Sequence, residues 1–152
     1  MAAIEKLGYK AKPSTLSPAK TGAATRPVQF RVPADAPPFF VEAIKRARSA
    51  KQPVVIDFWA GWCAACLQLK HETLEHPDVV QALRSVEMIY VDLDEHPALG
   101  DAYDVVAIPD VLFVDRSGRI VDRLHKFEPP DAFVARIQKV VGQVSKDDRV
   151  PK

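Results

Sequence analysis

Cys63 and Cys66 are the only cysteines of this chain, and their spacing is that of a reactive pair. They form a Cys-x-x-Cys turn that follows directly after the apolar segment 54–59. A helix that begins at such a turn brings the two sulfurs within disulfide reach, and its free N–H groups and dipole stabilise a thiolate. The pattern predicts a redox dithiol in which Cys63 is the nucleophile and Cys66 resolves the mixed disulfide.

Three other uses of the cysteine pair compete with redox chemistry. A closed zinc site needs four ligands, and the sequence has no second Cys-x-x-Cys and no histidine spacing that completes one. A structural disulfide that closes so short a loop gains little from chain entropy. Binding of Cu(I) or Hg(II) needs only the two soft thiolates and is the alternative function. We predict an enzyme, a thiol-disulfide oxidoreductase that reduces or exchanges protein disulfides.

Asp57 is the one charged residue in the apolar segment 54–59. A continuous apolar run is typical of a strand that is covered on both faces, where an ionised carboxylate is costly. Burial should raise the pKa of Asp57, so that it can accept the proton of Cys66 at working pH. A hydrogen-bonded structural acid is the alternative interpretation.

Two tryptophans, Trp59 and Trp62, flank the cysteine turn. We expect Trp59 to pack inside the protein. We expect Trp62 to stay partly exposed, where it offers an apolar contact to protein substrates.

These residues resemble the motifs of the thioredoxin superfamily over about residues 39–142. Segment 57–66 looks like the family's strand with a buried acid and its active-site turn, and segment 108–114 looks like its cis-proline loop and next strand. The resemblance is greatest to the C-terminal thioredoxin-like domain of bacterial thiol:disulfide interchange proteins. It implies a proton relay by Asp57 and a cis bond before Pro109, where the backbone of Ile108 pairs with an extended substrate. It implies no bound cofactor and no metal.

Three features depart from the ordinary thioredoxin pattern. Ala64 and Ala65 lie between the cysteines in place of Gly-Pro, Asp110 follows the proline in place of threonine, and Lys126 lies about where a glycine is usual. These departures bear on partner choice and reduction potential and leave the reaction class unchanged.

Hydrophobic periodicity predicts an α/β protein with the thioredoxin fold, in which a mixed central sheet has helices on both faces. Residues 115–118 are predicted to form a hairpin turn, and the alternating Val28, Phe30 and Val32 suggest an added edge strand. Strands are expected at 54–59, 86–93, 111–114 and 120–124, and helices at 40–50, 67–72, from 77, at 97–103 and from 130 to just before Gly142.

The N-terminal segment 1–38 differs in composition from the rest of the chain. Residues 12–38 contain six of the thirteen prolines and are interpreted as a linker. Residues 1–11 resemble the end of a heavy-metal-associated domain, which would make the chain a fragment, and a chance amphipathic start is the alternative. The thioredoxin-like domain is predicted to span 39–145, with a polar tail at 146–152.

Charge and hydropathy restrict the possible partners. The formal net charge is +1 with charges interspersed, which argues against nucleic acid and anionic membranes. No stretch is long and apolar enough to span a bilayer, and no signal peptide is recognisable. We expect a monomer that meets protein disulfide substrates and an upstream redox partner. A complete chain would be cytoplasmic, whereas a fragment of an interchange-type membrane protein would be periplasmic.

Overall fold

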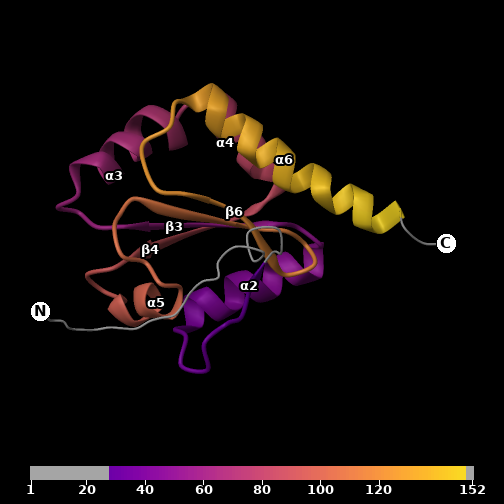
Figure 1. Ribbon diagram of the computed structural model, residues 1–152, viewed down its shortest axis with the longest axis horizontal. Coiled ribbons are helices and arrows are strands. Elements are labelled where there is room, and N and C mark those ends of the chain that lie inside the picture. The colour runs from indigo at the N-terminus through magenta and orange to yellow at the C-terminus, as the bar shows by residue number, and fades with distance from the viewer. Residues whose placement is uncertain (1–27, 150–152) are drawn as a thin grey trace, which may run out of the picture.

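The computed structural model describes the backbone of residues 28–149 and the side chains of residues 28–142. These residues form a mixed, five-stranded sheet between two layers of helices, as the sequence predicts (Figure 1). The strands are β2 (Val28–Gln29), β3 (Val54–Trp59), β4 (Glu87–Asp92), β5 (Asp110–Val114) and β6 (Arg119–Leu124). Their order is β2-β6-β5-β3-β4, with β3 and β4 parallel and every other neighbouring pair antiparallel.

Helices cover both faces of this sheet (Figure 1). A 3₁₀ turn, η4 (Leu83–Ser85), connects the helix α4 (Pro77–Ala82) to β4. One face carries α3 (Ala64–Gln68), the π-helical segment η3 (Leu69–Leu74), α4 (Pro77–Ala82) and α6 (Pro130–Arg149), and the other carries α2 (Pro38–Ala50) and α5 (Pro97–Ala102).

The central strand β3 sends alternate side chains into two separate cores, because successive side chains of a strand point to opposite faces. Val54, Ile56 and Phe58 pack in the core under α2 and α5. Val55 packs in the other core, which α3, α4 and α6 cover. Asp57 is two residues after Val55, so its side chain points to the same face of the sheet. This is the face that α3, which begins at the cysteines, covers.

The edge strand suggested by the alternation near residue 28 is present. Val28 pairs with Ile120 of β6, and Phe30 follows into the core with 5% of its surface exposed. The Phe30 ring stacks on Tyr103 at 5.3 Å between centroids, and the Tyr103 hydroxyl donates to the carbonyl of Arg31 at 2.7 Å. Residues 28–38, which composition assigns to the linker, therefore pack against the domain. The rest of that linker and segment 1–11 lie outside the described residues.

The C-terminal helix α6 is longer than predicted. We expected it to end before Gly142, but it continues to Arg149, so that prediction was wrong. A glycine inside a helix costs only about 1 kcal/mol relative to alanine, which does not end a helix that its neighbours favour. Residues 146–149 of the expected polar tail are thus helical, and residues 150–152 lie outside the described part.

Candidate active site

The two cysteines are joined by a disulfide at the start of α3, with their Cα atoms 5.2 Å apart. Cys63 is the N-cap residue of this helix, and its sulfur accepts a hydrogen bond from the backbone N–H of Cys66 at 3.1 Å. Both side chains are buried, with 6% of Cys63 and 2% of Cys66 exposed. Cys66 is thus the deeper of the two, and one of the free amides of the first helical turn, that of Cys66, points at the Cys63 sulfur.

The loop that ends at Pro109 lies beside the disulfide. The carbonyl oxygen of Ile108 is 3.6 Å from the sulfur of Cys63. The peptide bond between Ile108 and Pro109 is cis. Pro109 is buried and Ile108 is half-buried. The backbone of Ile108 thus lies in contact with the nucleophile.

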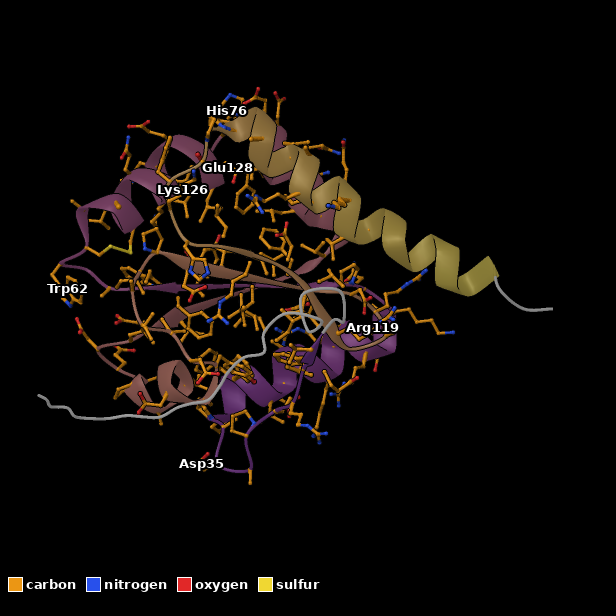
Figure 2. The ribbon with its side chains drawn as sticks, in the orientation of Figure 1. Asp35, Trp62, His76, Arg119, Lys126 and Glu128 are labelled. Carbon is orange, nitrogen blue, oxygen red and sulfur yellow. A yellow bond between two sulfur atoms is a disulfide. The ribbon has the colours of Figure 1, made fainter. Side chains whose placement is uncertain are left out.

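Trp62 lies at the tip of the turn before the disulfide (Figure 2). Its side chain is 71% exposed, and its indole N–H donates to the carboxylate of Asp94 at 3.1 Å. The expected exposed aromatic surface is therefore present next to Cys63. Trp59 points inward and is half-buried.

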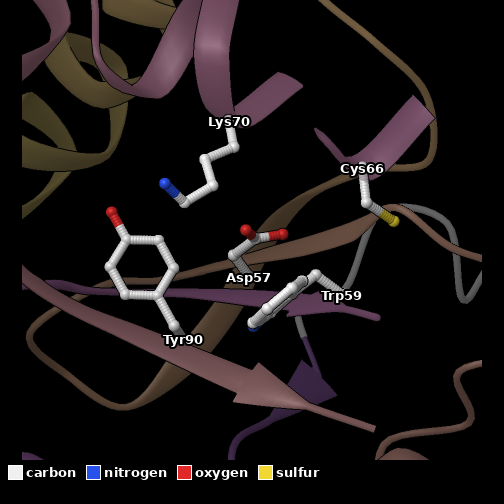
Figure 3. A pocket seen from close by; sticks show the side chains of 5 residues that line it. All are labelled: Asp57, Trp59, Cys66, Lys70 and Tyr90. Atoms are coloured by element: carbon white, nitrogen blue, oxygen red, sulfur yellow. The ribbon is translucent and has the colours of Figure 1, made fainter. Parts of the chain in front are cut away.

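A cavity of about 230 Å³ lies behind the disulfide (Figure 3), and it brings together Asp57, Trp59, Cys66, Lys70 and Tyr90. Asp57 is 3% exposed, and its Oδ1 atom has no hydrogen-bond partner. Burial raises the pKa of Asp57 to about 7, and the negative charge of Asp110 adds to this effect. A carboxyl group with such a pKa can exchange protons with Cys66 near neutral pH.

Lys70 and Tyr90 are members of this cavity that the sequence analysis missed. Lys70 follows Cys66 by four residues and lies on η3, which continues directly from α3, and Tyr90 is the register partner of Asp57 on β4. The Lys70 ammonium group is 2.6 Å from a carboxylate oxygen of Glu75. Burial and the charge of Asp57 raise the pKa of Tyr90. The i, i+4 spacing from Cys66 and the strand register were the signals that could have identified them.

The positions that depart from the thioredoxin pattern differ in burial. Asp110 is completely buried directly after the proline. Lys126 is exposed in the connection between β6 and α6 (Figure 2). Asp110 can therefore affect the site only from inside the fold, whereas Lys126 is part of the surface that a partner would meet.

Within the described residues, no group of three or more histidine, cysteine or acidic side chains is arranged to hold a metal ion. A soft metal bound at this site would have the two thiolates as its protein ligands. None of the described helices is long and apolar enough to cross a membrane.

Comparison with known proteins agrees with this geometry. The thioredoxin family model matches residues 35–139. The chain is 33% identical over 128 residues to mitochondrial thioredoxin of Rattus norvegicus, and the match covers 84% of this chain and 74% of that protein. It is 32% identical over 100 residues to the thiol:disulfide interchange protein DsbD of Vibrio vulnificus, and this match covers 62% of this chain but only 17% of that protein.

The fold is also similar to a solved interchange domain. The oxidised C-terminal domain of DsbD from Neisseria meningitidis superposes with a TM-score of 0.60 at 26% identity, covering 74% of this chain and 98% of that domain. The matched regions include the strand, the dithiol turn and the proline loop that form the site. On these grounds the chain belongs to the thioredoxin family.

Proposed function

We propose that this protein is a thiol-disulfide oxidoreductase that reduces or exchanges disulfides of protein partners through Cys63 and Cys66. The observation that carries the proposal is the pairing of the two cysteines at the N-terminus of α3. Family membership supports the same reaction class over capture of a soft metal. No cofactor is required, because the sulfur atoms carry the electrons themselves.

The reaction begins from the dithiol form. The Cys63 thiolate attacks one sulfur of the substrate disulfide, a bond forms between Cys63 and substrate, and the leaving substrate sulfur takes up a proton. Cys66 then loses its proton and attacks the Cys63 sulfur, so the second substrate sulfur leaves and is protonated in turn. Two electrons pass to the substrate, and the enzyme ends as the Cys63–Cys66 disulfide described above.

Asp57 accepts the proton of Cys66 in this proposal. Both residues line the same cavity, and the unpartnered Oδ1 atom of Asp57 is available to accept a proton directly or through water. Its pKa of about 7 suits proton exchange at neutral pH. A purely structural acid would be expected to have hydrogen bonds to both oxygens.

Trp62, Ile108 and Pro109 form the proposed substrate contact. The exposed ring of Trp62 offers apolar area, and the Ile108 carbonyl next to Cys63 offers a backbone acceptor. An extended peptide that pairs with this backbone would bring its own disulfide to the nucleophile.

An upstream dithiol partner must supply two electrons and two protons to reopen the Cys63–Cys66 disulfide after each turnover. The chain spans only 17% of the interchange protein of Vibrio vulnificus, so that protein's own partners are not transferred to this one. If the chain is part of such a membrane protein, we expect it to be located in the periplasm. If the chain is complete, we expect it to be located in the cytoplasm. We expect it to work as a monomer.

Insulin reduction with dithiothreitol as electron donor tests the proposal, with Cys63→Ser as the inactive control. Catalysed precipitation of the insulin B chain by the wild type, and its loss in the variant, is the expected result. The soft-metal alternative is tested on the reduced protein by competition for Cu(I) against a chelator. Tight Cu(I) binding without insulin reduction would overturn the proposal in favour of metal handling.

A further inference from the structure

One guanidinium group holds both ends of the loop that lies against the disulfide. Arg123 donates from Nε to Oδ1 of Asp110 at 2.9 Å and from Nη2 to Oδ2 of Asp110 at 2.8 Å. The same Nη2 atom donates to the carbonyl of Tyr103 at 2.6 Å. Tyr103 directly precedes the loop 104–109 and Asp110 directly follows it, so Arg123 bridges the two ends.

The loop between these anchors packs against the core through Val105 and Ile108, whereas its residues 106 and 107 are exposed. Asp104 adopts a left-handed conformation with φ of 58°, and the side chain of Val106 is 91% exposed. The ends, in contrast, are firmly placed, because Tyr103 stacks on Phe30 in the core and Asp110 is completely buried at the start of β5. Arg123 therefore adds a polar bridge between the two ends of the loop to the apolar contacts that Val105 and Ile108 make with the core.

The ion pair has a directional geometry that suits this task. Arginine presents its donors in a rigid planar fork, and two of its nitrogens meet the two oxygens of the Asp110 carboxylate. Arg123 itself is on β6, whose Leu124 pairs with Val111 of β5. His125 is the other basic group near this carboxylate, with Nδ1 3.8 Å from Oδ2 of Asp110. The sheet thus serves as the fixed frame from which Arg123 holds the loop.

We propose that Arg123 is a positioning residue for protein substrates: by bridging the Tyr103 carbonyl and the Asp110 carboxylate, it holds the Ile108 backbone where a substrate strand pairs beside Cys63. The inference rests on the proposed reduction of protein disulfides. It predicts that Arg123 matters for substrates that pair with the loop and not for small disulfides that only meet the sulfur.

Arg123→Gln tests the proposal, with Arg119→Gln as the matched control. Arg119 belongs to the same strand and donates to Asp115, a carboxylate as buried as Asp110, but at the end of the molecule away from Trp62 (Figure 2). Turnover is measured with insulin and with cystine, and amide hydrogen exchange is followed in residues 104–109.

For Arg123→Gln we expect kcat/KM for insulin to fall about tenfold to a hundredfold, chiefly through KM, because small misplacements of a binding group have effects of this size. Turnover of cystine should be unchanged, and exchange in the loop should become faster. Arg119→Gln should change none of these quantities. Equal losses with insulin and cystine, or unchanged kcat/KM for insulin, would overturn the proposal.

Two further variants keep the test decisive if Arg123→Gln folds poorly. Asp110→Asn combined with Arg123→Gln removes the unpaired buried charge along with the bridge, and should fold and still lose more activity with insulin than with cystine. Arg123→Lys keeps the charge but lacks the fork, so it should retain stability and lose the same activity. A wild type that reduces cystine but not insulin would refute the proposed function itself, which is a separate outcome.

Discussion

Asp57 and Tyr90 are opposite each other on the parallel strands β3 and β4, and their side chains line one cavity behind Cys66 (Figure 3). Asp57 is 3% exposed, whereas Tyr90 is 47% exposed, so the cavity extends from the buried sulfur toward the surface. Its volume of about 230 Å³ is sufficient for water. In the proposed mechanism, a proton that Asp57 takes from Cys66 would therefore have a route to solvent past Tyr90.

The two cysteines are predicted to differ in reactivity toward alkylating reagents. In the reduced protein, iodoacetamide should label Cys63 first, because Cys63 is the N-cap residue and the more exposed of the two. Cys66→Ser should accumulate mixed disulfides with substrate, and Cys63→Ser should form none. Mass spectrometry of the labelled peptides measures the order, and faster alkylation of Cys66 would contradict the assignment.

Asp57 is predicted to make the oxidised protein less stable as the pH rises. Its pKa is 3.8 in the reference state and about 7 in the fold, so folding takes up a proton between these values. The contribution of Asp57 to the free energy of unfolding is therefore fully present below pH 4 and is lost progressively up to pH 7. Above pH 7 it no longer changes. Asp57→Asn should remove this loss, and its gain in unfolding free energy should be about 2–3 kcal/mol larger at pH 8 than at pH 5.

Urea unfolding of the wild type and Asp57→Asn at both pH values measures this difference. Asp115→Asn serves as a control, because Asp115 is a buried acid that accepts hydrogen bonds from Ser117 and Arg119. A gain from Asp57→Asn that is the same at both pH values would mean that Asp57 does not carry the predicted titration.

The pH profile of turnover should change with Asp57 as well. As the base for Cys66, Asp57 works only when ionised, so the resolving step should accelerate as the pH rises through about 7. Asp57→Asn should slow this step and abolish the inflection near pH 7. Stopped-flow measurement of mixed-disulfide decay follows the step directly. A variant that keeps the inflection would assign the base to another group.

Trp62 is predicted to act on substrate binding through its ring. Trp62→Ala should raise KM for insulin and leave turnover of cystine unchanged, because the exposed indole contributes apolar contact area. Trp62→Phe keeps an aromatic ring but loses the hydrogen bond to Asp94, and should retain most of the affinity. If Trp62→Phe raises KM for insulin as much as Trp62→Ala does, the hydrogen bond to Asp94 matters more for substrate binding than the ring.

Gly142 offers a test of the unexpected length of α6. Gly142→Ala should stabilise the protein by about 0.5–1 kcal/mol, because the helix continues through this position and, outside the helix's own backbone, an added Cβ meets no atom of the described residues within 4 Å. Gly118→Ala is the opposite control. Its φ of +88° disfavours other residues, and a Cβ there would lie 3.0 Å from the Gln29 amide nitrogen. Thermal unfolding measures both, and destabilisation by Gly142→Ala would argue against the continued helix.

Several features of the site could be predicted because they depend on neighbours in the sequence. The apolar run of β3, the Cys63–Cys66 spacing and the hairpin turn ending at Gly118 are local patterns, and the structure has each of them. The burial of Asp57 also followed from its place in the apolar run. Local steric and hydrophobic preferences act within a few residues, so the sequence reveals them directly.

The contacts between distant segments were decided by the tertiary structure. Lys70 and Tyr90 share a cavity with Asp57 because a helix crosses one face of β3 and β4. The spacing of Lys70 from Cys66 is a local signal, but which strands this side of the helix faces depends on the crossing. The end of α6 was predicted wrongly because a single glycine was given more weight than the surrounding helix. Arg123 reaches both Tyr103 and Asp110 only after the hairpin has folded back beside the loop. The sequence by itself thus determined the chemistry of the dithiol, whereas packing between elements decided which groups surround it, because such contacts depend on how all of the elements fit together at once.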